Sequence, residues 1–459
     1  MQWKVSEVAQ TLGLTTTLSG SICGVSTDTR TIEKNELFLA LSGERFDGHE
    51  YAQLAFQKGA KMLVLEHAVE GVPDESCLLV EDTREAYYRL ATAYRETLVI
   101  PIIGITGSVG KTSVKEMVAA ALAPFYPVHK TAENLNNELG VCQTVLAIPE
   151  DAGAAVIEMG IDHPGDMDLL TSIVRPDVAV VTGIGISHLE IMGSRERLFE
   201  EKMAISNGMR PQAPMILLGD NDLLEDIKSW KTHRTFRYGL CHADDEIYGT
   251  NLLENTEYFS TAFTVCIKEN EYPAEIPTLG KANVQNALAA CGVLYVLDLP
   301  IEKGIVGLKN YQPVGMRQKI VRAGKVTVIE DCYNASPTSM TAAIDLLSHM
   351  ETQGRRIAVL GDMLELGEEA PVYHQEMGKQ VATGAVDRGY FTGTLSKEAY
   401  KTAKASGMTE VFWEEEGPLF AEKVASELED GDIVLLKASR ALRLEQVADA
   451  IYQRYPKNQ

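Results

Sequence analysis

The segment that most constrains the fold of this chain begins at Val99 and ends near Ala123. The apolar run Val99-Ile100-Pro101-Ile102-Ile103 is followed by Gly104-Ile105-Thr106-Gly107-Ser108-Val109-Gly110-Lys111-Thr112-Ser113 and then by helical spacing of apolar residues. This order predicts a buried strand, a tight turn and a helix that begins at Thr112. Glycines allow backbone N–H groups to face an anion, and the helix N-terminus adds partial positive charge. The segment therefore predicts an α/β domain that binds phosphate groups.

Two side chains in this loop carry the chemistry of nucleotide binding. Lys111 supplies a full positive charge for the β- and γ-phosphates, and Thr112 can bind Mg²⁺ through its hydroxyl. The spacing departs from the usual pattern, because the first glycine is Gly104 and the residue expected to be glycine is Ile105. A chance Gly-Lys-Thr is the alternative, but the strand and the helix on either side favour a phosphate loop. The residues predicted to contact the phosphates are Gly107, Ser108, Val109, Gly110, Lys111, Thr112 and Ser113.

Short apolar strands alternate with helical patterns along nearly the whole chain, which predicts α/β layers with parallel sheets. We divide the chain into three domains, at residues 1–99, 100–315 and 316–459. In the first domain the expected elements are strands Leu37–Leu41, Met62–Leu65 and Leu78–Val80 and helix Tyr51–Lys58. In the second they are strands Ala154–Ile157 and Val178–Thr182, a β-rich extension within 206–277 and helix Asn283–Leu297.

The third domain has the pattern of a second doubly wound sheet. Its expected strands are Val326–Asp331, Arg356–Leu360 and Ile433–Lys437. Its expected helices are Ser339–Met350, Tyr373–Thr383 and Leu442–Tyr452. The predicted fold class is therefore α/β, with a small N-terminal α/β domain, a central phosphate-loop domain with a parallel sheet, and a C-terminal Rossmann-like domain.

The charge balance of the chain limits its partners. With 42 basic and 65 acidic side chains, its net charge is −23. Such a surface repels nucleic acid and anionic membranes, so we expect neither as a partner. The seven cysteines are scattered and form no Cys-x-x-Cys pair, which argues against disulfides and zinc and favours a reducing compartment. The first residues lack a signal-peptide pattern and no apolar run is long enough to span a bilayer, so we expect a cytoplasmic protein.

Three further side chains lie downstream of the loop. Glu158 ends an apolar run, and ligands bind beyond the carboxyl ends of strands in open parallel sheets. An acid there can reach a phosphate-bound Mg²⁺. His188 follows the strand Val178–Thr182, and Lys202 lies in the helical stretch 198–205. Taken alone, these two are better explained as an ordinary loop histidine and a surface lysine.

Taken together, these residues resemble the Mur ligases, the ATP-dependent amide-forming enzymes of peptidoglycan synthesis. The loop Gly104–Ser113 is similar to the family's phosphate loop, displaced glycine included. Glu158, His188 and Lys202 fall where the family keeps its metal cluster. Within the family, the chain most resembles the members that add D-alanyl-D-alanine to UDP-N-acetylmuramoyl-tripeptide. The segments that carry this resemblance are Asn134-Leu135-Asn136-Asn137-Glu138, Tyr333-Asn334-Ala335-Ser336-Pro337 and Gly361-Asp362-Met363-Leu364-Glu365-Leu366-Gly367.

The resemblance implies a separate task for each domain. The N-terminal domain would hold the UDP end of the substrate through Ser26, Thr27, Asp28, Arg30, Gly43, Arg45, Asp47 and His49. The nucleotide would contact Asn283 and Asn286 of the central domain and Arg317 and Asp331 of the C-terminal domain, with Asp331 at the ribose. The dipeptide side would include Tyr333, Asn334, Lys437 and Arg440. The implied catalytic residues are Lys111, Asn137, Glu158, His188 and Lys202.

The same resemblance implies ATP as the energy source, two Mg²⁺ ions, and CO₂ bound as a carbamate on Lys202. Thr112 and Glu158 would hold one ion, and His188 and the carbamate would serve the second. An unmodified ammonium has no lone pair for a metal, whereas a carbamate offers anionic oxygens. The substrate carboxylate would become an acyl phosphate, which the dipeptide amine then attacks.

Four residues depart from the family pattern, namely Ala282, Met316, Ser336 and Ala438. They concern the adenine and dipeptide contacts, and none removes a charged group. Two rival functions stay open at this point. One is a Mur-type ligase or folylpolyglutamate-type synthetase with a different amine acceptor. The other is a nucleotide-binding regulator without ligase activity. We expect the protein to be a monomer.

Overall fold

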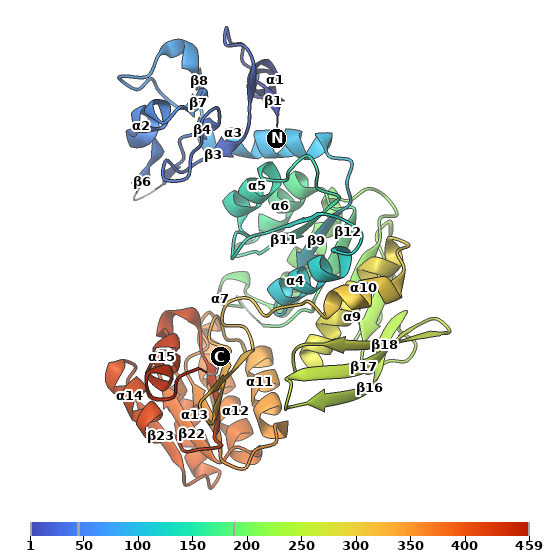
Figure 1. Ribbon diagram of the computed structural model, residues 1–459, viewed down its shortest axis with the longest axis vertical. Coiled ribbons are helices and arrows are strands. Elements are labelled where there is room, and N and C mark those ends of the chain that lie inside the picture. The colour runs from blue at the N-terminus through green and yellow to red at the C-terminus, as the bar shows by residue number, and fades with distance from the viewer. Residues whose placement is uncertain (1, 44–45, 187–188, 458–459) are drawn as a thin grey trace.

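The computed structural model describes residues 2–43, 46–186 and 189–457. These residues form three α/β units that follow one another along the molecule, as the colours from blue to red show in Figure 1. The N-terminal unit holds a parallel sheet in the order β3-β4-β7-β8, with bounds Val25–Ser26, Leu37–Leu39, Met62–Leu65 and Cys77–Leu79. Its three predicted strands are confirmed, and the predicted helix is the short α2, Ala52–Gln57.

Smaller elements complete the N-terminal unit. The helix α1 spans Val5–Thr11, and two short antiparallel pairs join β1 to β2 and β5 to β6. The bounds of these strands are Trp3–Lys4, Ser21–Ile22, Ser42–Gly43 and Phe46–Asp47. Single 3₁₀ turns follow at Gly48–Tyr51 and Asp74–Ser76.

A helix that the sequence reasoning missed joins the N-terminal unit to the central domain. α3, Thr83–Thr97, begins where the Asp82 carboxylate accepts two backbone N–H hydrogen bonds. It packs against α5 (Glu138–Leu146) and α6 (Asp166–Val174) and lies between the two units in Figure 1. Its Arg95 side chain donates hydrogen bonds to the carbonyls that follow α6 and to a carboxylate, so one buried guanidinium fixes this junction.

We expect Arg95→Met to lower the free energy of unfolding by about 3 kcal/mol, because it removes the buried cationic partner of Asp177 and the donor to the Val174 and Arg175 carbonyls. The Asp177 carboxylate then keeps the exposed Arg210 and the Ile102 N–H as partners. Arg95 is 9% exposed and lies 3.0 Å from Asp177. Urea denaturation followed by circular dichroism measures the change. Arg175→Met is the matched control, since the Arg175–Glu96 pair is about half exposed on both sides and should contribute less than about 1 kcal/mol. Equal losses in the two variants would contradict the prediction.

The central domain is built on a sheet that has ten strands among the described residues. The order is β10-β11-β9-β12-β13-β15-β16-β17-β18, and β14 pairs with β15. All neighbours from β10 to β16 are parallel, whereas β16, β17 and β18 are antiparallel and form the predicted β-rich extension. The bounds from β9 to β18 are Ile102–Thr106, Val128–Lys130, Ala154–Glu158, Val178–Val181, Met215–Leu218, Ser229–Trp230, His233–Gly239, Ile247–Asn255, Ser260–Ile267 and Asn270–Ile276.

Helices cover both faces of this sheet, and its inner strands β9, β11 and β12 are buried and almost entirely apolar. α4 (Lys111–Leu122), α9 (Lys281–Val296) and α10 (Ile301–Leu308) pack on one face. α5 and α6 pack on the other, together with α8 (Arg195–Met203). The short α7 is Leu189–Met192, and a 3₁₀ turn spans Ala204–Gly208. This layering brings the ends of β9, β11 and β12 to the same edge as the start of α4.

The C-terminal domain repeats the three-layer plan with the sheet order β19-β20-β24-β21-β22-β23. All neighbours are parallel except β19 and β20, and the predicted doubly wound sheet is confirmed. The bounds from β19 to β24 are Lys319–Ala323, Val326–Glu330, Arg356–Leu360, Arg388–Thr392, Val411–Glu414 and Ile433–Lys437. One face carries α11 (Pro337–His349), α12 (Ala370–Thr383) and α13 (Ser396–Ala405), and the other carries α14 (Pro418–Ser426) and α15 (Glu445–Arg454). Short 3₁₀ turns lie at Gly367–Glu369 and Arg440–Leu442.

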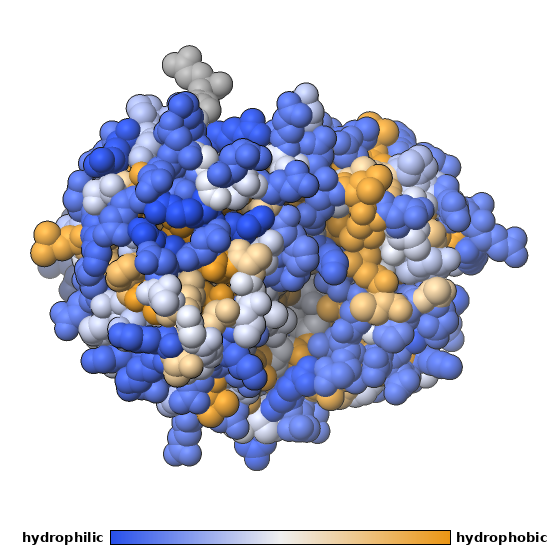
Figure 2. Space-filling model, turned by 90° about the horizontal axis from the view of Figure 1, so that it is seen from below, coloured by the Kyte–Doolittle hydropathy of each residue, from blue (hydrophilic) through white to orange (hydrophobic). Residues whose placement is uncertain are grey.

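The surface seen from below is mainly hydrophilic, with apolar side chains gathered in separate patches (Figure 2). This agrees with the large excess of acidic residues in the sequence. Within the described parts of the chain, no helix combines the length and the apolar character needed to cross a membrane.

Candidate active site

The phosphate loop lies between β9 and α4, as predicted, but it is shorter than the sequence suggested. Gly104 belongs to β9 and not to the turn. A Cβ at Gly104 would lie 2.8 Å from Pro176 and 3.0 Å from the Met159 sulfur, so close packing beside the strand explains this glycine. The turn itself runs from Gly107 to Gly110, and both glycines have positive φ angles, +145° and +87°. The displaced first glycine is thus a feature of the strand.

At Gly107 the wall of the turn leaves no room for a side chain. A Cβ at Gly107 would lie 2.0 Å from the hydroxyl of Thr182, which itself donates a hydrogen bond to the Val109 carbonyl at 2.5 Å. Ser108 is fixed to the segment after β12, since its N–H donates to the Gly183 carbonyl at 2.9 Å. The loop is therefore held from β12, and a glycine turn that leads into a helix N-terminus is the arrangement typical of an anion site.

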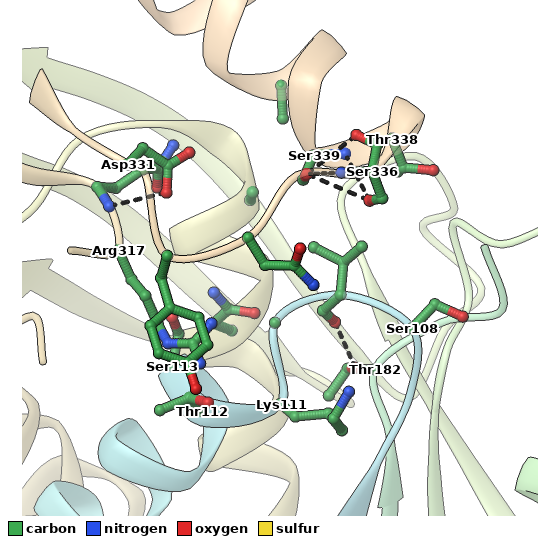
Figure 3. A pocket seen from close by; sticks show the side chains of 18 of the residues that line it. Ser108, Lys111, Thr112, Ser113, Thr182, Arg317, Asp331, Ser336, Thr338 and Ser339 are labelled. Atoms are coloured by element: carbon green, nitrogen blue, oxygen red, sulfur yellow. Dashed lines mark hydrogen bonds between the residues drawn. The ribbon is translucent and has the colours of Figure 1, made fainter. Parts of the chain in front are cut away.

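The two chemically active side chains of the loop, Lys111 and Thr112, lie at the start of α4 and line the same pocket (Figure 3). Lys111 donates a hydrogen bond from its ammonium to the Gly107 carbonyl at 2.9 Å. Burial lowers the pKa of Lys111, with Glu158 opposing this effect and Arg317 adding to it. The Thr112 hydroxyl donates to Oε2 of Glu158 at 3.0 Å. Loop, helix and strand β11 thus meet at one point, which brings together Thr112 and Glu158, the two residues predicted to share a metal ion.

Glu158 is only 1% exposed, and its polar groups are held by several partners. Its Oε1 accepts a hydrogen bond from the Asn136 amide at 2.9 Å. Its backbone N–H donates to the Thr131 hydroxyl at 2.9 Å. A carboxylate oxygen beside a hydroxyl is a donor set that suits Mg²⁺, which prefers oxygen ligands.

Residues of the C-terminal domain face the loop from the other side (Figure 3). The Arg317 guanidinium stacks on the Tyr333 ring with 3.7 Å between the guanidinium carbon and the ring centroid. The Lys437 ammonium, buried at the end of β24, lies 2.6 Å from Oδ2 of Asp331. The backbone N–H of Gln318 donates to the other Asp331 oxygen at 3.1 Å. These contacts place cationic groups and one oriented carboxylate opposite the phosphate loop.

The helix α9 supplies the third wall. The Asn283 amide donates to the Leu279 carbonyl at 2.8 Å and to the Gln318 side chain at 2.6 Å, so it joins the central and C-terminal domains. The Asn286 side-chain amide donates to Oδ1 of Asn283 at 3.3 Å. Both side chains line the space above Gly110, and the Asn286 oxygen would be 3.0 Å from a Cβ at that glycine.

These walls enclose a cavity of about 410 Å³ between the central and C-terminal domains. A space of this size holds a ligand of nucleotide dimensions. The predicted residues that line it are Ser108, Val109, Gly110, Lys111, Thr112, Ser113, Glu158, Asn283, Asn286, Arg317, Asp331, Tyr333, Asn334 and Lys437. The structure therefore brings together residues that lie more than 300 positions apart in the chain.

Some predicted residues lie elsewhere in the part of the chain that the structure describes. Asn137 caps α5 by accepting a hydrogen bond from the Gly140 N–H at 3.0 Å, and its neighbour Asn136 is the residue that contacts Glu158. Arg440 pairs with Glu445 at 2.8 Å at the rim of the C-terminal domain. The catalytic role of Asn137 and the dipeptide role of Arg440 stay predictions.

Lys202 is 1% exposed at the end of α8. Burial, with the Lys111 ammonium adding to it, holds the pKa of Lys202 well below its usual range. The neighbouring Glu201 carboxylate accepts hydrogen bonds from the N–H groups of Gly165 and Met167, which fixes α8 against the start of α6. His188, the other residue predicted for the second metal, lies outside the described residues.

The predicted UDP-binding residues form two clusters in the N-terminal unit, away from the cavity (Figure 1). In the first cluster, Arg30 forms an ion pair with Asp28 at 2.6 Å, and the Ser26 hydroxyl donates to the Asp28 carbonyl; Thr27 lies between them. In the second, which begins at Gly43, the His49 ring lies 2.7 Å from the Asp47 carboxylate. Arg45 lies outside the described residues.

Several residues at the site were missed by the sequence reasoning. Thr182, Gln318 and Thr338 line the cavity, and Thr131 and Lys115 lie behind Glu158. Asn136 lies in the segment 134–138 that carries the family resemblance, but the sequence predicted no site role for it. The position of Lys115 could have been predicted from its spacing. It follows Thr112 by three residues, and residues at i and i+3 share a helix face.

Comparison with known proteins gives matches over most of the chain. The sequence model described as Mur ligase family, catalytic domain, matches residues 21–138. The Mur ligase middle domain matches residues 105–294, and the Mur ligase glutamate ligase domain matches residues 316–440. Together these matches cover well over half of the chain and include every wall of the cavity.

Whole-length relatives agree with the domain matches. The UDP-N-acetylmuramoyl-tripeptide–D-alanyl-D-alanine ligase of Bacillus subtilis (strain 168) is 38% identical over 434 residues, covering 93% of this chain and 92% of the relative. A crystal structure of MurF from Acinetobacter baumannii superimposes with a TM-score of 0.88 at 28% identity, covering 98% of this chain and 99% of that one. MurF ligase from Thermotoga maritima in complex with ADP gives a TM-score of 0.83 at 26% identity over 94% and 97%.

Proposed function

Because this chain belongs to the Mur ligase family, we propose that it joins D-alanyl-D-alanine to UDP-N-acetylmuramoyl-tripeptide, converting ATP to ADP and phosphate. The observation that carries the proposal is the cavity in which Lys111, Thr112 and Glu158 face Arg317 and Asp331, in a chain similar over nearly its full length to ligases of that name. The activity is a cytoplasmic step of peptidoglycan synthesis, and the product is the UDP-N-acetylmuramoyl-pentapeptide.

The reaction requires activation of a carboxylate, since a carboxylate and an amine do not condense in neutral water. The γ-phosphate of ATP transfers to the carboxylate of the tripeptide, the bond to the β-phosphate oxygen breaks, and ADP leaves. The free amine of the dipeptide then attacks the acyl carbon, loses a proton, and the tetrahedral intermediate expels phosphate. Two anions meet in the first step, so catalysis consists mainly of charge neutralisation and positioning.

The residues of the cavity fit these tasks. Lys111 and Arg317 neutralise phosphate charge from opposite sides of the cavity. The N–H groups of the loop fix the phosphates in line with the acceptor. Asp331, held by Lys437, offers an oriented carboxylate to the ribose hydroxyls. Asn283 and Asn286 line the adenine side.

The donor atoms also fit the divalent metal that the family implies. Thr112 and Glu158 would hold one Mg²⁺, because their oxygens lie 3.0 Å apart in a buried place beside the loop. Lys202, as a carbamate, and His188 would hold a second. When bound, the metal supplies positive charge that the phosphoryl oxygens share during transfer.

The test is release of inorganic phosphate by the purified protein with ATP, Mg²⁺ and a UDP-N-acetylmuramoyl-tripeptide. We expect release to need D-alanyl-D-alanine and to match pentapeptide formation one to one. Tripeptides with different third residues then define the substrate. Release that depends on another amine, such as glutamate, would favour the rival ligases. ATP binding without any acceptor-dependent release would favour a regulator and contradict the proposal.

A further inference from the structure

A second lysine of the phosphate-loop helix is buried directly behind the Glu158 carboxylate. Lys115 follows Thr112 by one turn of α4, so both side chains lie on the same face of the helix. The Lys115 side chain is 1% exposed. Lysine is almost never fully buried unless it is paired, so its partners show what it holds in place.

The Lys115 ammonium has three partners in the structure. It donates a hydrogen bond to the Thr131 carbonyl at 2.7 Å. It lies 3.3 Å from Oε1 of Glu116 and 3.8 Å from Oε2 of Glu158. The Glu116 carboxylate also pairs with Lys130, whose side chain is 43% exposed. Two lysines and two glutamates therefore balance in charge.

Lys115 connects to Glu158 by two routes. The direct route is the ion pair with Oε2, the same oxygen that accepts the Thr112 hydroxyl hydrogen bond. The second route runs through Thr131, whose carbonyl accepts from Lys115 and whose hydroxyl accepts the Glu158 N–H. Both the carboxylate and its backbone are thus tied to one buried ammonium.

The connection matters because the orientation of the Glu158 carboxylate depends on the partners of its two oxygens. Its Oε1 is held by the Asn136 amide, whereas Oε2 has the Thr112 hydroxyl and the Lys115 charge. Removing a buried partner of a charged group leaves that group poorly solvated, and it turns or shifts to find another donor. The side chains behind a metal ligand fix its orientation and tune the affinity of the metal.

We propose that Lys115 is a positioning residue that keeps Oε2 of Glu158 beside the Thr112 hydroxyl, and so sets how strongly Mg²⁺ and nucleotide bind together. This inference rests on the proposed function only in taking Thr112 and Glu158 as the nucleotide-linked metal site. A purely structural lysine, tying α4 to the segment at Thr131, is the alternative.

The quantity that separates the two is the coupling between Mg²⁺ and ADP. It is the Kd for ADP without metal divided by the Kd for ADP with saturating Mg²⁺, measured by calorimetry on the full-length protein. In Lys115→Met we expect the coupling factor to fall about 10-fold or more, with binding of metal-free ADP nearly unchanged. A structural lysine predicts no selective loss of coupling.

Lys130→Met is the matched control. It removes one lysine from the same cluster, but Lys130 contacts Glu116 and is half exposed. We expect its coupling factor to change by no more than about twofold. Lys115→Gln is the second variant, since its amide can still donate to the Thr131 carbonyl without the charge, and we expect it to lose coupling as well.

Three outcomes overturn the inference. The first is an unchanged or larger coupling factor in Lys115→Met and Lys115→Gln, which would show that the ammonium only repels the metal or only supports the fold. The second is an equal loss in Lys130→Met. The third is unfolding of both Lys115 variants without ligand, which makes the lysine structural. No amine acceptor enters this experiment, so its result does not depend on which amine the protein accepts. If the unaltered protein showed no coupling between Mg²⁺ and ADP, the assignment of Thr112 and Glu158 as the metal site would itself be wrong.

Discussion

Lys111→Ala is expected to lower kcat for acceptor-dependent phosphate release by about 10³-fold or more, the scale of losing a principal charge on a transferring phosphoryl group. Lys111 begins α4, and its ammonium already lies against the Gly107 carbonyl, inside the turn that we propose as the phosphate site. Arg317 lies across the cavity and cannot replace a charge within the loop. Steady-state and single-turnover assays with saturating ATP measure the effect.

Two further variants separate the charge from the fold. Lys111→Arg keeps the charge in a broader, planar group, and we expect it to recover only a small part of the activity. Lys303→Ala removes an exposed lysine of α10 whose ammonium lies over the Phe125 ring, and we expect full activity. Near-normal turnover by Lys111→Ala would remove the assignment of the turn Gly107–Gly110 as the phosphate site.

The parts of this site that follow from local rules could be predicted from sequence. The strand before Gly107 and the helix after Gly110 are signalled by an apolar run, glycines and a helical pattern within 25 residues. Glu158 could be placed because it ends a strand of a parallel sheet. The sequence nevertheless predicts Gly104 as part of the loop, since only its close approach to Pro176 and Met159 shows that it is a packing glycine of β9.

What could not be predicted depends on contacts between distant segments. Helical spacing could place Lys115 on the same face of the helix as Thr112. That Thr131 and Glu158 surround its ammonium depends on the fold and could not be predicted. The pairing of Lys437 with Asp331 likewise joins the ends of two strands 106 positions apart. Helix α3 is a different case, because its Asp82 cap and its helical spacing of apolar residues are local features from which the helix could have been predicted.

The second large effect is expected at Lys202. Lys202→Ala should lower kcat by about 10²-fold or more. Under the proposed function Lys202 holds the second Mg²⁺ as a carbamate, so its loss takes that positive charge away from the phosphoryl group during transfer. If the lysine acts as a carbamate, the amine must be neutral to react with CO₂. Burial beside the Lys111 ammonium favours the neutral form, since it holds the pKa of Lys202 well below its usual range. A plain ammonium at this place would instead repel a metal ion.

Rescue separates the carbamate from a simple structural lysine. In Lys202→Ala, bicarbonate or a short carboxylic acid such as acetate can occupy the space left by the side chain and present anionic oxygens. We expect partial recovery with these anions, and none in Lys111→Ala, which loses a cation. The unaltered protein should give a ¹³C NMR carbamate signal with labelled bicarbonate, and Lys202→Ala should lack it. The contrary result has two parts: Lys202→Ala folds but stays inactive with every anion, and the unaltered protein gives no carbamate signal. Together these would show that Lys202 acts as an unmodified amine. The unmodified amine would then be a packing residue of α8, the helix that the Glu201 contacts with the N–H groups of Gly165 and Met167 fix against the start of α6.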